Sequence, residues 1–290
     1  TRPLARKPSS RWTKGRPRTN IRTRLVNGGE SKMKTIILAG GWGTRLGQHT
    51  EWIPKPMVQI GNRPMVWHIM KVYAHFGYRD FIVSTGVKAH IIKEYFLNYE
   101  AYSNDFTRDF REGTIEYQDS QSDIDWRVSV IDTGLNSLKG ARIKRLEHYL
   151  TDEVNMATYG DGLADIDVHD LVTFHQSHGK IVTITGVHPP ARFGEITELS
   201  GVVTKFSEKP QTSVGLINGG FMVFNRELLD HLSVAEDCDL ERGPLKQLSL
   251  DGQVMVYKHQ GLWECVDHER DLVHLNQLWN SNNAFWKIWS

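Results

Sequence analysis

The sequence of 290 residues is poor in cysteine and in long apolar runs, and each shortage excludes a class of protein. Two cysteines, Cys238 and Cys265, are too few for a disulfide scaffold or for a zinc site built on four thiolates. No segment approaches the roughly 18 consecutive apolar residues of a membrane-spanning helix, which excludes an integral membrane protein. The composition, 39% hydrophobic and 24% charged, is that of a globular protein, and so few thiols suit the cytoplasm.

The charge of the chain is unevenly distributed. Residues 1–32 hold ten of the 35 lysines and arginines but only one of the 34 acidic residues, so a basic arm precedes an acidic body. The arm has no sustained apolar periodicity, and we expect it to be disordered. Three interpretations are open: a tail that binds nucleic acid or an anionic membrane, an organelle transit peptide, or an upstream extension. The extension is favoured because Met33 directly precedes the first expected strand, so we expect neither nucleic acid nor a membrane as partner.

The body, residues 33–290, alternates between apolar runs and amphipathic segments. Residues 35–38 and 81–84 are typical of buried parallel strands, and residues 64–76 have the periodicity of a helix. A strand, a helix and a strand within about fifty residues indicate a βαβ unit. Further strands are expected at 126–131, 156–159, 181–187, 202–206 and 221–224, and further helices at 89–99, 140–150 and 167–178. Three more elements, at 241–250, 254–257 and 269–279, close the chain. We predict one α/β domain, a mixed and mostly parallel sheet flanked by helices, with an embellished C-terminal third.

A glycine-rich segment, Gly40-Gly-Trp-Gly-Thr-Arg45, follows the first expected strand. Glycines let backbone N–H groups approach a phosphate closely, and the guanidinium of Arg45 suits phosphate oxygens. Ten residues further on, Lys55 stands between two prolines that present it from a stiff segment. The segment is not the dinucleotide fingerprint, because Leu46 stands where the third glycine is needed, and no Gly-Lys-Ser/Thr completes a P-loop. A turn and a rigid loop without a ligand remain the alternative.

Two aspartates follow expected strands. Asp161 lies between two glycines, and Asp267 follows the segment 262–266. In open α/β sheets ligands bind at the carboxyl ends of the strands. Two carboxylates that meet at a triphosphate would suit Mg²⁺, which prefers oxygen ligands shared with phosphates. The alternatives are that Asp161 shapes a turn and that Asp267 caps the last helix.

Together these motifs resemble those of the sugar-1-phosphate nucleotidylyltransferases, the enzymes that make NDP-sugars, and most closely the glucose-1-phosphate cytidylyltransferases among them. The resemblance covers residues 33–289. It rests on G-G-x-G-T-R-L from Gly40, P-K-P-M-V from Pro54, W-H-I-M-K from Trp67, Y-G-D-G from Tyr159, R-F-G from Arg192, E-K-P from Glu208 and N-G-G from Asn218. The chain departs from the usual W-x-P-M-D-T before the last helix, where Cys265 replaces the proline and His268 the threonine, and from the usual Ser-Glu-Glu-Thr at residues 47–50.

The resemblance implies a Rossmann-like nucleotidyltransferase domain that transfers a cytidylyl group from CTP to α-D-glucose 1-phosphate. The products would be pyrophosphate and CDP-glucose, a precursor of deoxysugars and of polysaccharides such as the O-antigen of lipopolysaccharide, with Mg²⁺ as cofactor. Catalysis is assigned to Arg45 and Lys55 and metal binding to Asp161 and Asp267. The residues assigned to the nucleotide are Leu38, Ala39, Gly40, Gly41, Trp42, Gly43, Thr44, Thr133, Arg142 and Gly160, and those assigned to the sugar phosphate are Glu208, Lys209, Asn218 and Gly219.

Other functions are kept open. A thymidylyl-, uridylyl- or guanylyltransferase acting on a hexose 1-phosphate would need the same motifs. A non-catalytic sugar-nucleotide-binding subunit predicts the loss of a charged site residue, yet Arg45, Lys55 and both aspartates are present. A glycosyltransferase predicts a D-x-D metal motif, which residues 123–125 and 165–167 match, but it does not explain the glycine-rich segment.

The resemblance also implies a homo-oligomer, a hexamer by analogy. Phe285, Trp286 and Trp289 lie near the C-terminus. Packing in the core or at an interface is expected for the two tryptophans, and any aromatic residues exposed there are expected to form part of a subunit interface. His68, inside an expected helix, is instead expected to be a hydrogen-bonded structural residue.

Overall fold

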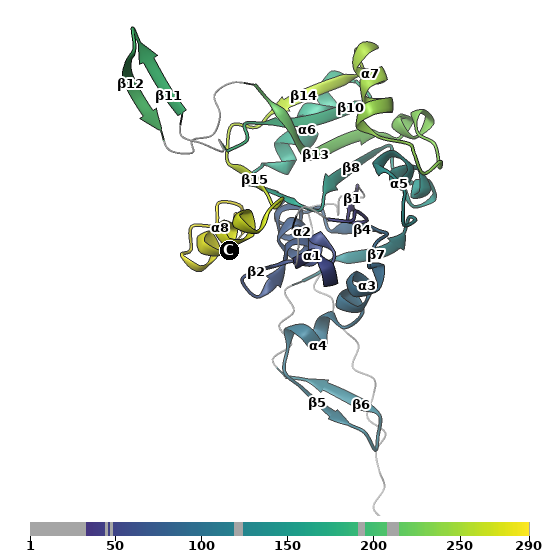
Figure 1. Ribbon diagram of the computed structural model, residues 1–290. Helices are drawn as coiled ribbons and strands as arrows, with labels where there is room; N and C mark the ends of the chain where they lie inside the picture. The colour runs from purple at the N-terminus through teal and green to yellow at the C-terminus, as the bar shows by residue number, and fades with distance from the viewer. Residues whose placement is uncertain are drawn as a thin grey trace, which may run out of the picture. The chain divides into compact units, whose positions relative to one another are not determined.

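The computed structural model describes residues 33–43, 46, 49–118, 124–190, 195–207 and 215–289, so the arm at 1–32 lies outside it. A seven-stranded sheet has the order β14-β10-β13-β8-β1-β4-β7 (Figure 1). Its strands are β1 Lys34–Leu38, β4 Asp80–Thr85, β7 Arg127–Asp132, β8 Val154–Tyr159, β10 Val182–Val187, β13 Ile217–Asn225 and β14 Val254–Lys258. Only β13 is antiparallel to its neighbours, β10 and β8. The mixed, mostly parallel sheet that the sequence predicts is confirmed.

Both faces of the sheet are buried, because side chains alternate between the faces and both sets are apolar. In β1, Ile36 belongs to a core that includes Leu228, whereas its neighbour Ile37 belongs to another that includes Tyr73. Helices α2 Met65–His75, α3 Ala89–Leu97, α6 Val168–His178 and α8 Glu269–Asn280 contribute to the core around Ile37; α5 Lys139–Arg145, α7 Lys246–Leu250 and the 3₁₀-helix η4 Arg226–His231 contribute to the other. In the described part of the chain, no helix is long and apolar enough to cross a membrane.

Two segments of the chain are each divided between two kinds of helix. The segment 140–150 forms α5 and a separate 3₁₀-helix, η3 Glu147–Tyr149. The segment 241–250 begins as a π-helix, η5 Glu241–Leu245, and continues as α7. Pro244 lies inside η5, and the Leu245 N–H bonds five residues back to the Leu240 carbonyl. The missing N–H of a proline removes one bond of a regular α-helix, so the wider turn accommodates it.

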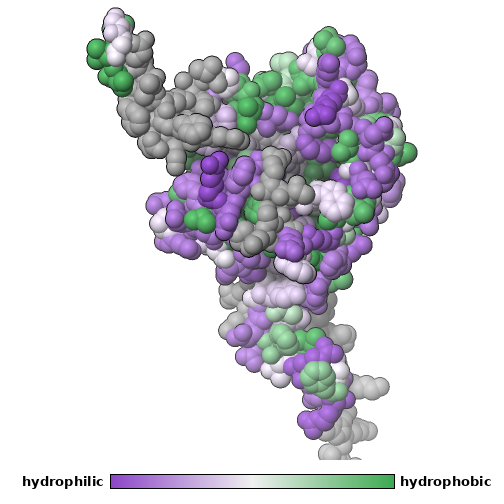
Figure 2. All heavy atoms as spheres, viewed as in Figure 1, coloured by the Kyte–Doolittle hydropathy of each residue, from purple (hydrophilic) through white to green (hydrophobic). Residues whose placement is uncertain are grey.

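Shorter elements complete the fold. The other helices of the described residues are α1 His49–Trp52, η2 Lys55–Met57 and α4 Tyr99–Ser103. There are also four two-stranded sheets. They pair β2 Gln59–Ile60 with β3 Arg63–Pro64, β5 Phe106–Asp109 with β6 Thr114–Tyr117, β9 Gly162–Ala164 with β15 Trp263–Cys265, and β11 Glu195–Leu199 with β12 Val202–Ser207. The β5–β6 and β11–β12 hairpins carry exposed apolar side chains, among them Phe110, Ile115, Leu199 and Val202 (Figure 2).

The C-terminal aromatic residues do not form an exposed surface, which corrects the sequence-based expectation. Trp286 is fully buried, and Phe285 and Trp289 are half-buried. The indole Nε1 of Trp286 donates a hydrogen bond to Nδ1 of His68 (3.3 Å). The other ring nitrogen of His68 lies 3.0 Å from the Ile60 carbonyl oxygen, as a structural histidine should. The tail therefore packs onto α2 of its own chain and gives no support for an oligomer.

Candidate active site

A cavity of about 630 Å³ lies at the edge of the sheet where β1 and β8 end. Its walls contain residues from the glycine-rich segment, η2, α5, the turn after β8, the start of β13 and the loop after β15. The predicted site residues that line it are Leu38, Ala39, Gly40, Gly41, Trp42, Gly43, Lys55, Arg142, Gly160, Asp161, Asn218 and Asp267. Residues far apart in sequence are thus brought to one place, as the rule for open α/β sheets predicts.

Lys55 stands between the two aspartates. Its Nζ lies 2.7 Å from Oδ2 of Asp161 and 2.7 Å from Oδ1 of Asp267. Burial by itself lowers the pKa of Lys55, but the charges of the two carboxylates and the hydrogen bonds to them outweigh burial and hold the pKa above its ordinary value. The three groups therefore form one charged cluster with the ammonium at its centre.

The carboxylates of this cluster fit a divalent cation. Oδ2 of Asp161 and Oδ1 of Asp267 both contact the ammonium of Lys55, so the two carboxylates point toward the same positively charged group. Mg²⁺ is commonly bound by one or two carboxylates together with substrate phosphates. Among the described residues, no group of three or more His, Cys, Asp and Glu side chains could hold a metal. Asp161 and Asp267 would therefore have to share the ion with phosphate and water oxygens.

The loop that carries Asp267 is held by the first turn of α8. The N-cap of that helix is His268, and Oδ2 of Asp271 accepts hydrogen bonds from the N–H groups of Asp267 (3.0 Å) and His268 (2.8 Å). The side chain of Asp267 is therefore not the N-cap, which removes the capping alternative for this residue.

Arg142 holds the glycine-rich segment in place through hydrogen bonds to the backbone. Its guanidinium donates hydrogen bonds to the carbonyl oxygens of Gly40 (2.9 Å), Thr85 (2.9 Å) and Gly134 (2.9 Å), and to Oγ1 of Thr133 (2.8 Å). Burial lowers the pKa of Arg142 from its ordinary value. A Cβ at Gly40 would lie 2.1 Å from the guanidinium of Arg142, so a larger residue would displace Arg142 from its hydrogen bond with the Gly40 carbonyl. Arg142 thus ties the segment to two neighbouring loops.

The other predicted residues fall into three groups. Thr133 is buried and does not line the cavity; its hydroxyl donates to the Thr85 carbonyl. Gly219 does not line it either, and its carbonyl accepts from the indole of Trp263 (2.8 Å). Gly160 does line it, and a Cβ there would meet the ring of Pro56 at 2.8 Å. Thr44, Arg45, Glu208 and Lys209 lie outside the described residues.

Several cavity residues were not assigned to the site from the sequence, although Cys265 was noted as a departure from the family pattern. Tyr159, Lys139 and Cys265 line the cavity together with the residues above. Burial and the neighbouring aspartates raise the pKa of the Cys265 thiol to about 12, so this thiol stays protonated. Tyr159 belongs to the quoted Y-G-D-G motif, which could have pointed to it, whereas an isolated lysine at the start of a helix gives no such signal.

Three aspartates of the two D-x-D matches lie in the described residues, and each has a structural partner. Asp165 Oδ1 accepts from the backbone N–H of Leu262 (2.7 Å) and lies 2.9 Å from Nε2 of His259. Asp167 is the N-cap of α6 and accepts from the Asp170 N–H. Asp125 pairs with Arg79, and Asp123 lies outside the described residues. None of these three described aspartates lines the cavity that holds Lys55, Asp161 and Asp267.

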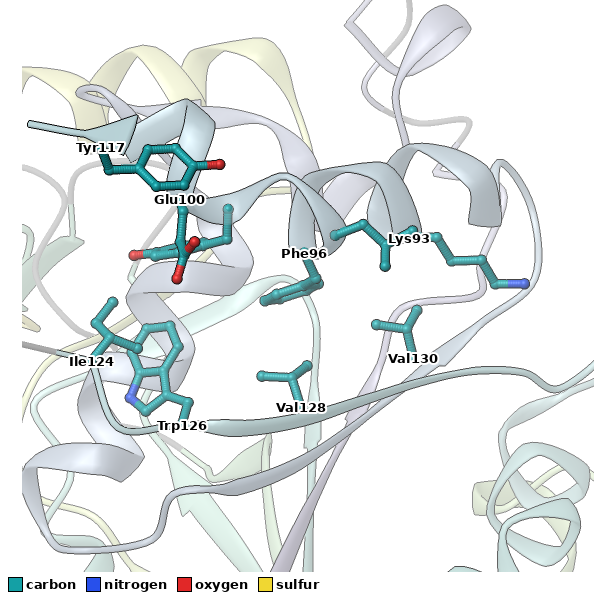
Figure 3. A pocket seen from close by; sticks show the side chains of 10 residues that line it. Lys93, Phe96, Glu100, Tyr117, Ile124, Trp126, Val128 and Val130 are labelled. Atoms are coloured by element: carbon teal, nitrogen blue, oxygen red, sulfur yellow. The ribbon is translucent and has the colours of Figure 1, made fainter. Parts of the chain in front are cut away.

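A second cavity, of about 740 Å³, lies between α3, α4, β6 and β7 and contains none of the predicted site residues (Figure 3). Phe96, Trp126, Val128 and Val130 face the space, and Lys93 and Glu100 also line it. It lacks the paired carboxylates and the glycine-rich backbone of the first cavity, which is therefore the candidate active site.

Comparison with known proteins agrees with this assignment. A family model described as "Nucleotidyl transferase" matches residues 34–280. The chain belongs to the nucleotidyl transferase family. The resemblance that the motifs indicate is thereby confirmed, and so is the prediction that the chain is a nucleotidyltransferase.

Curated relatives and solved structures give finer likenesses. The glucose-1-phosphate cytidylyltransferase of Salmonella typhimurium is 43% identical over 89% of this chain and 100% of its own length, and the probable glucose-1-phosphate cytidylyltransferase of Bacillus subtilis is 40% identical over the same shares. A UDP-glucose pyrophosphorylase solved with UDP-glucose matches with a TM-score of 0.61 and 15% identity, over 86% of this chain and 99% of that one. At that identity the structural likeness shows the shared fold.

Proposed function

We propose that this nucleotidyl transferase transfers a cytidylyl group from CTP to α-D-glucose 1-phosphate and releases CDP-glucose and pyrophosphate. The observation that carries the proposal is the cluster of Lys55, Asp161 and Asp267 beside the glycine-rich segment in one cavity. The choice of CTP and glucose 1-phosphate follows the names of the relatives that are 40–43% identical over their whole length.

The reaction requires positioning and charge neutralisation more than a covalent intermediate. A phosphate oxygen of glucose 1-phosphate attacks the α-phosphorus of CTP in line; the new P–O bond forms as the bond to the β-phosphate breaks, and pyrophosphate leaves with the electron pair. The backbone of the glycine-rich segment and Arg45 would bind the departing pyrophosphate. Lys55 would steady the charge that develops at the α-phosphate, and Arg142 would keep Gly40 and its neighbours in place.

Asp161 and Asp267 would hold Mg²⁺, which supplies charge neutralisation at the phosphates when bound. Glu208 would accept hydrogen bonds from the sugar hydroxyls and Lys209 would bind the incoming phosphate. Asn218, which lines the cavity, would contact the sugar from β13.

One assay tests the substrates. The protein is incubated with Mg²⁺, glucose 1-phosphate and each nucleoside triphosphate separately, then with several other sugar phosphates in place of glucose 1-phosphate, and pyrophosphate release is measured. We expect release with CTP. A clear preference for dTTP, UTP or GTP would identify another nucleotidylyltransferase, and no release with any combination of triphosphate and sugar phosphate would favour a sugar-nucleotide-binding subunit.

The setting is also a proposal. CDP-glucose would enter deoxysugar and polysaccharide synthesis, including O-antigen, in the cytoplasm. A homo-oligomer, with a hexamer as the analogous state, is supported by the exposed apolar side chains of the β5–β6 and β11–β12 hairpins, because isolated two-stranded hairpins are marginally stable in water. Light scattering should give a multiple of 33.2 kDa, and a particle of the chain mass would contradict the assembly.

A further inference from the structure

Four polar side chains form a continuous chain of contacts along one wall of the active-site cavity. The hydroxyl of Tyr159 donates to Oε1 of Glu241, and Nδ2 of Asn218 donates to the same hydroxyl (3.1 Å). The ammonium of Lys139 also contacts Oε1 of Glu241 and lies 4.1 Å from the ring centroid of Tyr159. Lys139, Tyr159 and Asn218 line the cavity. The carboxylate of Glu241 is thus connected to the cavity by its contacts with Tyr159 and Lys139.

The direction of these hydrogen bonds is set by the carboxylate. An ionised carboxylate accepts only, so Tyr159 must give its single proton to Glu241, and its oxygen is left to accept from Asn218. A tyrosine phenol is neutral near pH 7, so Tyr159 has that proton to give. The amide of Asn218 has its nitrogen toward Tyr159, and its oxygen accepts from the Gly220 N–H (3.0 Å), so the two contacts favour the same orientation.

The backbone around Glu241 is held against the helix that carries Lys139. The carbonyls of Glu236 and Cys238 accept from the N–H groups of Leu138 (2.8 Å) and Ala141 (3.2 Å). Glu241 itself is the first residue of the π-helix η5, a type of turn that often occurs at functional sites.

The ring of Tyr159 is also closely packed against Gly220 of β13. A Cβ at Gly220 would lie 2.8 Å from Cδ2 of the ring, so only glycine allows the two strands to approach this closely. The ring of Tyr159 is therefore placed by its close approach to Gly220 and by the ammonium of Lys139 over the ring.

We propose that Glu241 is a positioning residue for the sugar phosphate, acting through Tyr159 to orient the amide of Asn218. The inference rests on the proposed function. The second N–H of the Asn218 amide has no protein acceptor among the described residues, and it is the donor that a hydroxyl oxygen of the hexose 1-phosphate would accept from. Lys139 offsets the charge of Glu241, so the carboxylate can orient the chain without repelling the anionic substrates.

The test compares Glu241→Gln, Tyr159→Phe and the double variant with the wild-type enzyme. A glutamine can donate as well as accept, so the direction of the chain is no longer fixed. We expect Glu241→Gln to raise the KM for glucose 1-phosphate roughly fivefold to tenfold, the effect of one displaced hydrogen bond, with the KM for CTP within about twofold. Tyr159→Phe should give a similar increase, and the double variant no more than the larger single effect, because both act through one path.

The matched control is Glu147→Gln, which removes the carboxylate of a surface pair with Lys144 away from the cavity. It should leave both KM values unchanged, and thermal unfolding should show that all variants are folded. Equal increases in both KM values, multiplying effects in the double variant, or no change in the KM for glucose 1-phosphate would each overturn the inference. Should Glu241→Gln not fold, Tyr159→Phe alone carries the same test. A wild-type protein that releases no pyrophosphate would instead refute the proposed function.

Discussion

Replacing Lys55 by methionine removes a positive charge from the centre of the site and keeps the length of the side chain. The Lys55 side chain is 12% exposed, and its nitrogen contacts both Asp161 and Asp267. If the ammonium stabilises charge at the α-phosphate during transfer, its loss should lower kcat by about 10²–10³, the effect of removing one preorganised charged donor. The KM for glucose 1-phosphate should change less.

The same substitution should tighten metal binding in the absence of substrate. Without the ammonium, Asp161 and Asp267 repel each other and no cation competes with added metal. Their side chains are 32% and 21% exposed, so we take each ion pair with Lys55 as worth about 1 kcal/mol or less. The loss of both pairs, about 1–2 kcal/mol, corresponds to a gain of roughly fivefold to thirtyfold in metal affinity.

Two measurements separate these effects. Titration of Mn²⁺ into the protein without nucleotide, followed by the electron paramagnetic resonance of free Mn²⁺, gives the metal affinity. Pyrophosphate release against Mg²⁺ concentration gives kcat and its metal dependence. Lys144→Met, which removes the cation of the surface pair with Glu147, is the matched control and should leave both unchanged.

Asp161→Asn provides the opposite case. It keeps the shape of the side chain but weakens the bond to the metal, so excess Mg²⁺ should partly restore its activity. No concentration of Mg²⁺ replaces a missing ammonium group, so Lys55→Met should stay slow. Near-normal kcat in Lys55→Met, or the same response of both variants to Mg²⁺, would refute the assigned roles and leave Lys55 as a structural residue of a stiff loop.

Two further changes test the supports of the fold and the site. Gly40→Ala would place a Cβ 2.1 Å from the guanidinium of Arg142, so the KM for CTP should rise at least about tenfold; Gly41→Ala, whose Cβ meets nothing within 4 Å, should raise it less. Burial lowers the pKa of His68 to about 4. The unfolded chain, with a histidine pKa near 6.5, takes up the proton first, so stability is complete above about pH 6.5 and falls toward pH 4. Urea unfolding should show about 2 kcal/mol lost at pH 5 through this group, and His68→Gln should remove that part of the loss; an equal loss in both proteins would contradict this.

Much of the central sheet could be predicted because its signals are local. Three consecutive buried residues, Thr35 to Ile37, mark β1 as a strand covered on both sides. The helical periodicity before Gly77 predicts α2 within a residue at each end. The antiparallel direction of β13 has no local signal, because a buried strand reads the same in either direction.

The sequence predicts which kinds of side chain surround the cavity but not the contacts that they make. The sequence indicates that Arg142 has donors to offer, but its acceptors are mostly backbone carbonyls, which any residue could provide. Glu241 lies 82 residues from Tyr159, and the contact between them depends on a π-turn that no propensity predicts. The burial of Trp286 depends likewise on a long-range partner, His68.

Spacing along the sequence could not predict how Asp161 and Asp267 come together. Asp161 follows a strand of the central sheet, but Asp267 follows β15, which pairs with β9 outside that sheet. The register sets Cys265 opposite Gly162, and the Val266 N–H bonds to the Asp161 carbonyl (2.9 Å). The β9–β15 pairing therefore delivers Asp267 to Asp161, and the backbone bonds to Asp271 hold it there. That anchoring does not require a proline at position 265, so the cysteine there is compatible with a metal-binding role for Asp267.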